Sequence, residues 1–164
     1  MPGLLNDVSI RSLLNSGFSL TYNKTYDYIT TDSEIYALKN TCASESILCI
    51  GGGPVGSDAM RLVACANCLS IIQPTLLNQP RYVGFAYWYF TETKGFGFSP
   101  DNTIQQNICD IYNPSDNLRL CWHTDNKTGG YRLGNLTINY DSSYSKYAFV
   151  RHGKLFKLSK SKLI

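Results

Sequence analysis

Six cysteines constrain the fold of this chain more than any other feature of its sequence. An even number of cysteines in a small, tyrosine-rich chain is typical of a disulfide framework. The Cys-x-x-Cys pair formed by Cys65 and Cys68 could instead bind zinc. Zinc ribbons need a second close pair, however, and Cys42 and Cys49 are too far apart to form one. We therefore predict no metal site, no cofactor, and three disulfides among Cys42, Cys49, Cys65, Cys68, Cys109 and Cys121.

One of these disulfides can be assigned from the strand pattern. Two β-rich runs within residues 108–122 flank a turn-forming Asn-Pro-Ser-Asp-Asn stretch. In the antiparallel register in which Tyr112 faces Leu118, Cys109 lies opposite Cys121, close enough to bond after a small adjustment. The sequence therefore predicts a hairpin stapled by this disulfide. The other four cysteines then pair among themselves, in an order that the sequence leaves open.

Three N-x-[ST] sequons indicate the same compartment as the disulfides. Their asparagines are Asn23, Asn126 and Asn135. Disulfides persist in oxidising compartments, and such sequons carry N-linked glycans in secreted proteins. We therefore predict a secreted, extracellular glycoprotein. The first residues show neither the charged nor the apolar region of a signal peptide, so secretion implies a leader outside this sequence.

The composition excludes several classes of protein. Aromatic residues make up 13% of the 164 residues and charged residues 16%, which argues against disorder. No apolar run approaches the roughly 18 residues of a membrane span, so none is predicted. The 15 basic residues include five in 151–164, which leaves ten against 12 acidic residues in the rest of the chain. A nucleic-acid partner would need a basic face, so we expect none, and the basic tail either contacts polyanions or aids solubility.

Short strand patterns and turn signals alternate along most of the chain. Their spacing of about 8–12 residues is typical of β-sandwiches and barrels. A single short helix is expected near the N-terminus, capped by Asn6 or Asp7 and ended by Gly17. We predict one all-β antiparallel sandwich or barrel-like domain over residues 1–150, stapled by disulfides. A basic hairpin or tail over 151–164 follows it.

Four segments have specific local predictions. We expect strands over 34–38 and 69–73, and a long aromatic strand over 82–90. The glycine run over 51–56 lacks the lysine and hydroxyl residue of a phosphate-binding loop, and it is predicted to form a turn.

The densest aromatic stretch is Tyr87-Trp88-Tyr89-Phe90. In a strand, Trp88 and Phe90 face one way while Tyr87 and Tyr89 face the other. One of the two pairs belongs in the core. The other pair would present two phenolic rings on which the apolar face of a sugar or a partner's side chain can pack, unless a second layer buries both faces.

A second group of candidate residues lies near the predicted hairpin. In the register above, Asp110 shares a face with apolar neighbours, where an unpaired carboxylate is costly. Arg132 is the nearest basic candidate, so we predict a structural Asp110–Arg132 ion pair. Alternatively, these polar groups form a floor that binds sugar hydroxyls, to which the titratable ring of His123 could contribute. The full set of predicted ligand-binding residues is Tyr87, Tyr89, Trp122, His123, Tyr131 and Arg132.

Motifs of catalysis are missing from the sequence. It contains no Gly-x-Ser-x-Gly, no His-Glu-x-x-His and, once the disulfides are assigned, no cysteine–histidine couple. We therefore expect a protein that is not an enzyme and has no catalytic residue.

Four motifs follow one another along the second half of the chain. They are the aromatic run, Phe96-Gly97-Phe98-Ser99-Pro100, Arg119-Leu120-Cys121-Trp122-His123 and Gly129-Gly130-Tyr131-Arg132 before Gly134. This order resembles the YWYF…FGFxP…RLxWH…GGYRxG pattern of a poorly characterised family of secreted β-rich domains from invertebrates and protists, over about residues 40–150. The resemblance implies secretion and a single module, and it supplies no catalytic residue. The chain departs from the pattern at Cys109 and Cys121, where serine or alanine is expected, and in its basic tail.

Two functions are compatible with these features. The first is an extracellular, non-catalytic recognition module, carbohydrate-binding (lectin-like) or adhesive, whose partner is a glycan or an extracellular protein. The second is a self-associating structural subunit of an extracellular glycoprotein coat or fibre.

Overall fold

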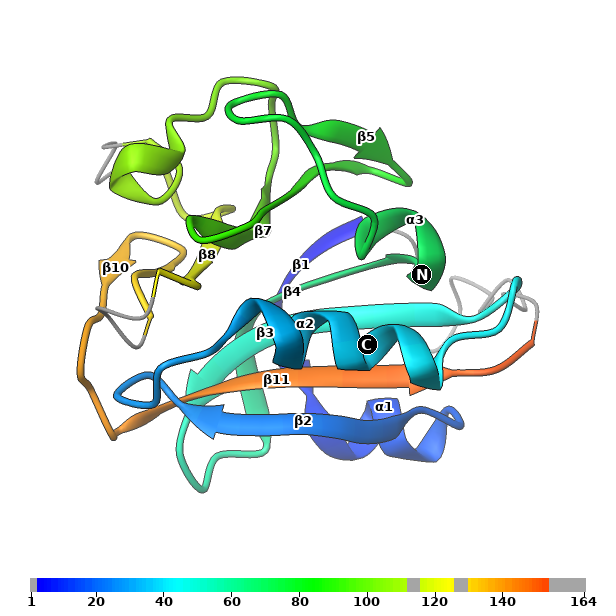
Figure 1. Ribbon diagram of the computed structural model, residues 1–164. Coiled ribbons are helices and arrows are strands. Elements are labelled where there is room, and N and C mark those ends of the chain that lie inside the picture. The colour runs from blue at the N-terminus through cyan, green and yellow to red at the C-terminus, as the bar shows by residue number, and fades with distance from the viewer. Residues whose placement is uncertain (1–2, 112–115, 126–129, 154–164) are drawn as a thin grey trace.

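The computed structural model describes residues 3–111, 116–125 and 130–153 (Figure 1). One sheet consists of β1 (Gly3–Ser9), β2 (Ser19–Thr25), β3 (Ile47–Pro54), β4 (Ala59–Asn67) and β11 (Tyr144–Arg151). A second sheet consists of β5 (Arg81–Val83), β6 (Ala86–Thr91), β7 (Gly95–Ser99), β8 (Leu120–His123), β9 (Arg132–Leu133) and β10 (Leu136–Thr137). The short helical segments are α1 (Ile10–Asn15), α2 (Asp32–Leu38), η1 (Lys39–Thr41), α3 (Cys68–Ile71) and η2 (Gln106–Ile108).

Both sheets are antiparallel, which confirms the predicted all-β, two-layer class. Their strand orders are β1-β4-β3-β11-β2 and β10-β9-β8-β7-β6-β5. Figure 1 shows β11 running between β3 and β2, so the last described strand lies inside the first sheet. The predicted tail beyond residue 153 and the sequon at Asn126 lie outside the described residues.

The main core lies between the two sheets and α2. From the second sheet it receives large aromatic side chains on β6, β7 and β8, and from α2 it receives Ile35 and Leu38. Burial of apolar side chains of this size contributes about 1.5–3 kcal/mol each, so this layer dominates the stability of the fold. Its largest fully buried side chains are Trp88, Trp122, Tyr26, Phe90, Phe96 and Phe98.

The glycine run that the sequence assigned to a turn lies within β3. Gly51 and Gly53 face β4 so closely that an added Cβ would lie 2.5 Å from the Leu62 carbonyl oxygen and 2.6 Å from that of Ala59. Glycine is therefore required here for close strand contact. The turn predicted over 51–56 is therefore shorter than expected: residues 51–54 belong to β3, and only Val55 and Gly56 form the turn.

Two segments predicted as strands are helices. α2 begins at a capping box in which the Thr31 hydroxyl accepts from the backbone N–H of Glu34, and the Glu34 carboxylate accepts from the backbone N–H of Thr31. α3 begins where the Asn67 side chain accepts from the backbone N–H of Ser70. In both places a local cap satisfies the first backbone donors of the helix, and this outweighs the strand propensity of the apolar residues that follow.

The N-terminal helix is shorter than predicted. Residues 3–9 form β1, and Ser9, instead of Asn6 or Asp7, caps α1 through a bond from the backbone N–H of Ser12. β1 pairs with β4 along its whole length, and this pairing uses the residues that were expected to form the first helical turn.

All six cysteines are in disulfides, as predicted. Cys49 and Cys65 are direct cross-strand partners on β3 and β4, and Cys42, after η1, bonds to Cys68 at the start of α3. The third bond joins Cys109 to Cys121. Three disulfides are consistent with an oxidising, extracellular environment.

Candidate functional site

The outer face of the six-stranded sheet carries the side chains that point away from the core. On β6, Trp88 and Phe90 enter the core while Tyr87 and Tyr89 face outward, as predicted from their alternation. The two tyrosines have different surroundings, however. Tyr89 is completely buried and Tyr87 only in part, so the outer face is covered at one end only.

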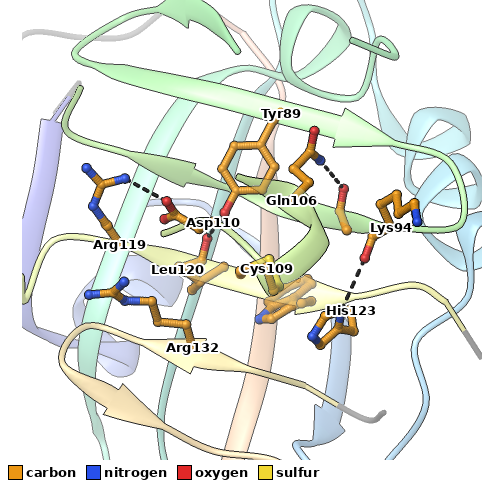
Figure 2. The surroundings of a disulfide bond; sticks show 12 residues. Tyr89, Lys94, Gln106, Cys109, Asp110, Arg119, Leu120, His123 and Arg132 are labelled. Atoms are coloured by element: carbon orange, nitrogen blue, oxygen red, sulfur yellow. Dashed lines mark hydrogen bonds and ion pairs between the residues drawn. A yellow bond between two sulfur atoms is a disulfide. The ribbon is translucent and has the colours of Figure 1, made fainter. Parts of the chain in front are cut away.

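Residues 100–111, called here the covering segment, bury Tyr89. Ile104 and Cys109 pack against it, and the Cys109–Cys121 disulfide ties the segment to β8 (Figure 2). The Tyr89 hydroxyl donates to the carbonyl oxygen of Leu120 at 2.9 Å. This bond spans β7 at Gly97, where a Cβ would collide with that oxygen. Glycine in the F-G-F motif therefore makes room for the tyrosine.

The disulfide between Cys109 and Cys121 is confirmed, but the hairpin predicted over 108–122 is wrong. Cys109 follows η2 and has a left-handed backbone with φ +54°, and Asp110 also has a positive φ of +90°. β8 pairs instead with β7 and β9. The covering segment thus crosses the sheet and does not extend it, because positive φ values at two successive residues are incompatible with a strand.

Arg119 is the buried centre of a cluster of three carboxylates. Its guanidinium contacts Asp110 at 2.6 Å, Asp101 at 2.6 Å and Asp116 at 2.5 Å. Figure 2 shows the guanidinium directed at the Asp110 carboxylate. Burial raises the pKa of Asp110 to about 7, although Arg119 and Arg132 oppose the shift. The cluster fixes both ends of the covering segment to the end of β8.

The predicted Asp110–Arg132 ion pair is therefore corrected to Asp110–Arg119. Arg132 donates instead to the backbone carbonyls of Gly134, Ile111 and Asp116, at 2.5–2.8 Å. Its side chain is buried and ties these three residues to β9. The incorrect hairpin register explains the error, because it placed Asp110 in a strand and Arg119 on the opposite face.

Three of the six predicted ligand-binding residues cannot form a surface. Tyr89, Trp122 and Arg132 are buried, and the Trp122 ring nitrogen donates to the Tyr26 hydroxyl at 3.2 Å inside the core. These side chains support the fold. In this structure they have almost no exposed surface with which to contact a ligand.

His123 and Tyr131 do lie together. Their ring centroids are 5.4 Å apart in an edge-to-face arrangement, and both side chains are partly exposed. His123 Nδ1 lies 3.3 Å from the Lys94 carbonyl oxygen and 3.9 Å from an Asp125 carboxylate oxygen. Burial lowers the pKa of His123, against the effect of Asp125, which favours a neutral ring at neutral pH.

An exposed aromatic surface remains at the uncovered end of the sheet. Tyr82 on β5 is the cross-strand partner of Tyr87, with ring centroids 5.0 Å apart and planes inclined by 56°. Tyr82 is 59% exposed and Phe85, in the turn between the two strands, is 58% exposed. We call Tyr82, Phe85 and Tyr87 the aromatic face. The sequence prediction included only Tyr87.

The sequence predicts a single strand over 82–90, and this prediction leaves Tyr82 and Phe85 out of the ligand-binding set. Gly84, with φ +69°, turns the chain so that Tyr82 comes back beside Tyr87. A glycine within an apolar run is a turn signal that was present in the sequence.

A groove of about 480 Å³ lies on the loop before β5, between Pro74 and Arg81, and no residue of the aromatic face lines it. The Arg81 guanidinium donates to the carbonyl oxygens of Ser70, Gln73 and Pro74, so it shapes the loop. The lining residues are Pro74, Thr75, Leu76, Gln79, Pro80 and Arg81.

A buried lysine lies in the five-stranded sheet. Lys146 on β11 donates to the Tyr28 carbonyl oxygen at 2.7 Å and to the Thr30 hydroxyl at 2.6 Å. Tyr22 bonds the same hydroxyl at 2.8 Å. Burial lowers the pKa of Lys146 to about 7. Through these bonds the lysine connects β11 to the segment before α2. Its side chain is fully enclosed, so it offers no surface to a ligand.

We compared the chain with protein-family models, curated proteins and solved structures. No family model, curated protein or solved structure matches it. The family resemblance seen in the sequence therefore stays a hypothesis, and no activity is transferred from a relative.

Two further observations concern the described part of the chain. None of its helices has the length and apolar character needed to cross a membrane. Nowhere in residues 3–111, 116–125 and 130–153 do three histidine, cysteine, aspartate or glutamate side chains gather as metal ligands could.

Proposed function

We propose that this protein is an extracellular, non-catalytic recognition module that binds carbohydrate through the aromatic face. The observation that carries the proposal is the inclined pair of Tyr82 and Tyr87 rings, 5.0 Å apart, with Tyr82 59% exposed. Exposed aromatic rings offer flat apolar surfaces that a sugar ring can cover while its hydroxyls stay in water. Within the described residues the Tyr82 hydroxyl makes no hydrogen bond, so it is open to a ligand.

Exposed amide side chains before β5 and after β7 support a carbohydrate over a purely apolar ligand. Gln79 is exposed and lines the groove on the loop before β5. Asn102, three residues beyond the end of β7, is also exposed. Amide side chains both donate and accept hydrogen bonds, which suits sugar hydroxyls. A few polar groups beside an apolar surface are the usual composition of a small-ligand site.

The extracellular part of the proposal is supported by the three disulfides and the sequons. The resemblance to secreted β-rich domains favours the same compartment. The non-catalytic part is supported by the sequence, which lacks the motifs of common catalytic sites.

A glycan array probed with the full-length protein tests the proposal, followed by titration of any glycan that binds. Replacing Tyr82→Ala should weaken binding by at least about tenfold, equivalent to about 1.4 kcal/mol. Tyr140→Ala is the matched control, because Tyr140 is equally exposed, at 59%, beyond β10 at the opposite edge of the sheet. An array without binders, or equal binding by wild type and Tyr82→Ala, would refute the proposal.

Self-association is a second candidate, favoured by two exposed apolar side chains in the loop before β5. Leu76 and Leu77 are 70% and 50% exposed, and large exposed apolar patches mark protein–protein contacts. In this case light scattering should show an oligomer that grows with concentration, and the double variant Leu76→Ser, Leu77→Ser should be monomeric. A monomer at every concentration tested would exclude this function.

A further inference from the structure

Among the sequons, Asn135-Leu136-Thr137 has a distinctive place in the fold. Gly134 and Asn135 connect β9 to β10, and Gly134 has the positive φ, +62°, that this tight connection requires. Asn135 and Thr137 are both exposed. The sequon therefore begins in a surface turn, which is where N-linked glycans are carried.

The orientation of the Asn135 amide is fixed by chemistry. Arg61 Nη2 on β4 donates to Asn135 Oδ1 at 2.8 Å. A guanidinium has only donors, so the group that faces it must be the amide oxygen, and the amide nitrogen must point elsewhere. That nitrogen, Nδ2, makes no hydrogen bond to any described residue. The atom that bears an N-linked glycan is thus open, while the rest of the amide is held.

We propose that Asn135 is an acceptor for an N-linked glycan. Transfer forms a bond between Nδ2 and C1 of the first sugar, and it breaks the bond between C1 and the diphosphate of a lipid-linked oligosaccharide donor. Nδ2 loses one proton, and the lipid diphosphate leaves. Because Oδ1 takes no part, the hydrogen bond from Arg61 is compatible with the glycosylated side chain and restrains the point from which the glycan extends.

Asn23 offers a less suitable acceptor in the folded chain. It lies within β2, opposite Tyr147 of β11, and the hydroxyl residue of its sequon, Thr25, is partly buried opposite Ser145. Both ends of that sequon belong to a paired strand. We therefore expect occupancy at Asn135 to exceed occupancy at Asn23.

A glycan at Asn135 would leave the aromatic face uncovered. β10 and β5 are the two edges of the six-stranded sheet, with four strands between them. At about 4.8 Å per strand, the two edges are about 24 Å apart. The inference goes beyond the proposed function, because the glycan is a modification of this protein and not its ligand.

The test uses the full chain, secreted from eukaryotic cells behind a leader peptide. Treatment with peptide N-glycosidase in heavy-oxygen water converts each glycosylated asparagine to labelled aspartate, which mass spectrometry locates. Asn135 should be labelled in the wild type. Thr137→Ser keeps the sequon and should keep the label, whereas Thr137→Val preserves the shape of the side chain but removes the hydroxyl and should lose it.

Unmodified Asn135 in the secreted wild-type chain overturns the proposal, and so does a label at Asn135 that persists in Thr137→Val. Comparing the wild type with Thr137→Ser does not depend on whether the valine variant folds. Binding by the aromatic face is measured separately on the same samples, so its failure and the failure of this proposal are distinct results.

Discussion

Arg119 and Asp110 form a fully enclosed ion pair, with 2.6 Å between Nη1 and Oδ1. The second carboxylate oxygen of Asp110 is buried and has no hydrogen-bond partner among the described residues. This incomplete satisfaction agrees with the raised pKa of Asp110, about 7, which burial causes. The pair thus holds the covering segment in place while leaving one of its members sensitive to pH.

The pH dependence of stability should report the Asp110 carboxyl. Its pKa rises from 3.8 in the unfolded chain to about 7 on folding, so the folded protein binds more protons between these values. The stability that this group contributes is complete below pH 3.8 and is lost as the pH rises to about 7. Asp110→Asn should remove this loss. Urea unfolding at pH 4.5 and about pH 7.5 measures it.

Other carboxylates act in the opposite direction, because hydrogen bonds lower the pKa of Asp58 and Asp141, and contacts with Arg119 lower that of Asp101. The relevant quantity is therefore the difference in the free energy of unfolding between Asp110→Asn and wild type, compared at the two pH values. An identical pH dependence in the two proteins would contradict a raised pKa at Asp110.

Replacing Arg119→Met should be more damaging than the Asp110 substitution. It leaves the carboxylates of Asp101, Asp110 and Asp116 without their shared cation, and removing one member of a buried ion pair costs about 3–5 kcal/mol. Chemical denaturation at pH 8 gives the change. Arg61→Met, at an exposed arginine, should change the free energy of unfolding by about 1 kcal/mol or less. Similar losses in the free energy of unfolding for Arg119→Met and Arg61→Met would argue against a stabilising role for the Arg119 cluster.

Lys146 should make the free energy of unfolding rise with pH above pH 7, whereas Asp110 makes it fall with pH below pH 7. Burial lowers its pKa from 10.5 to about 7, against the attraction of Glu34 and Asp27. Between these pH values the unfolded chain binds a proton that the folded chain lacks, so the free energy of unfolding rises with pH. Lys146→Met should abolish that rise between pH 7 and about pH 9.5. Lys24→Met, at its exposed cross-strand partner, should retain it, and a rise that survives in Lys146→Met would contradict the assignment.

Gly97 is expected to tolerate no side chain. A Cβ there would collide with the Leu120 carbonyl oxygen and lie 2.7 Å from the Tyr89 hydroxyl. Gly97→Ala should therefore destabilise the protein by about 1–3 kcal/mol through overpacking. Gly3→Ala on β1 is the control, because no atom lies within 4 Å of its added Cβ. Equal thermal midpoints for the two variants would show that the outer face is less tightly packed than described.

The sequence correctly predicted which side of β6 faces the core and that all six cysteines form disulfides. Alternation was sufficient to direct Trp88 and Phe90 inward, because strand geometry is local. It could not predict whether Tyr89 is covered, because that depends on a segment that begins eleven residues later and is held by Arg119. The choice of Arg132 as the partner of Asp110 failed for the same reason.

Some errors were local and could have been avoided. The threonine and glutamate of the capping box at Thr31 and Glu34 are separated by the standard three residues, and Gly84 interrupts the aromatic run. The register error at Cys109 was different in kind. Cys109 has a positive φ between η2 and the carboxylate of Asp110, and neither the local sequence nor the cysteine count indicates it.

Trp122 and Tyr82 should respond to alanine in opposite ways if the ligand surface is the aromatic face. Trp122 is fully enclosed between Phe96 and Tyr22, with ring centroids 5.8 Å from each, so Trp122→Ala should lower the free energy of unfolding by about 3–5 kcal/mol. Tyr82→Ala removes an exposed ring and should change the free energy of unfolding by about 0.5 kcal/mol or less, while it weakens carbohydrate binding by at least about tenfold. Denaturation and binding measured on the same preparations separate the two roles. If Trp122→Ala folds with near wild-type stability and loses binding, the ligand site includes β8 and the aromatic face is not the whole site.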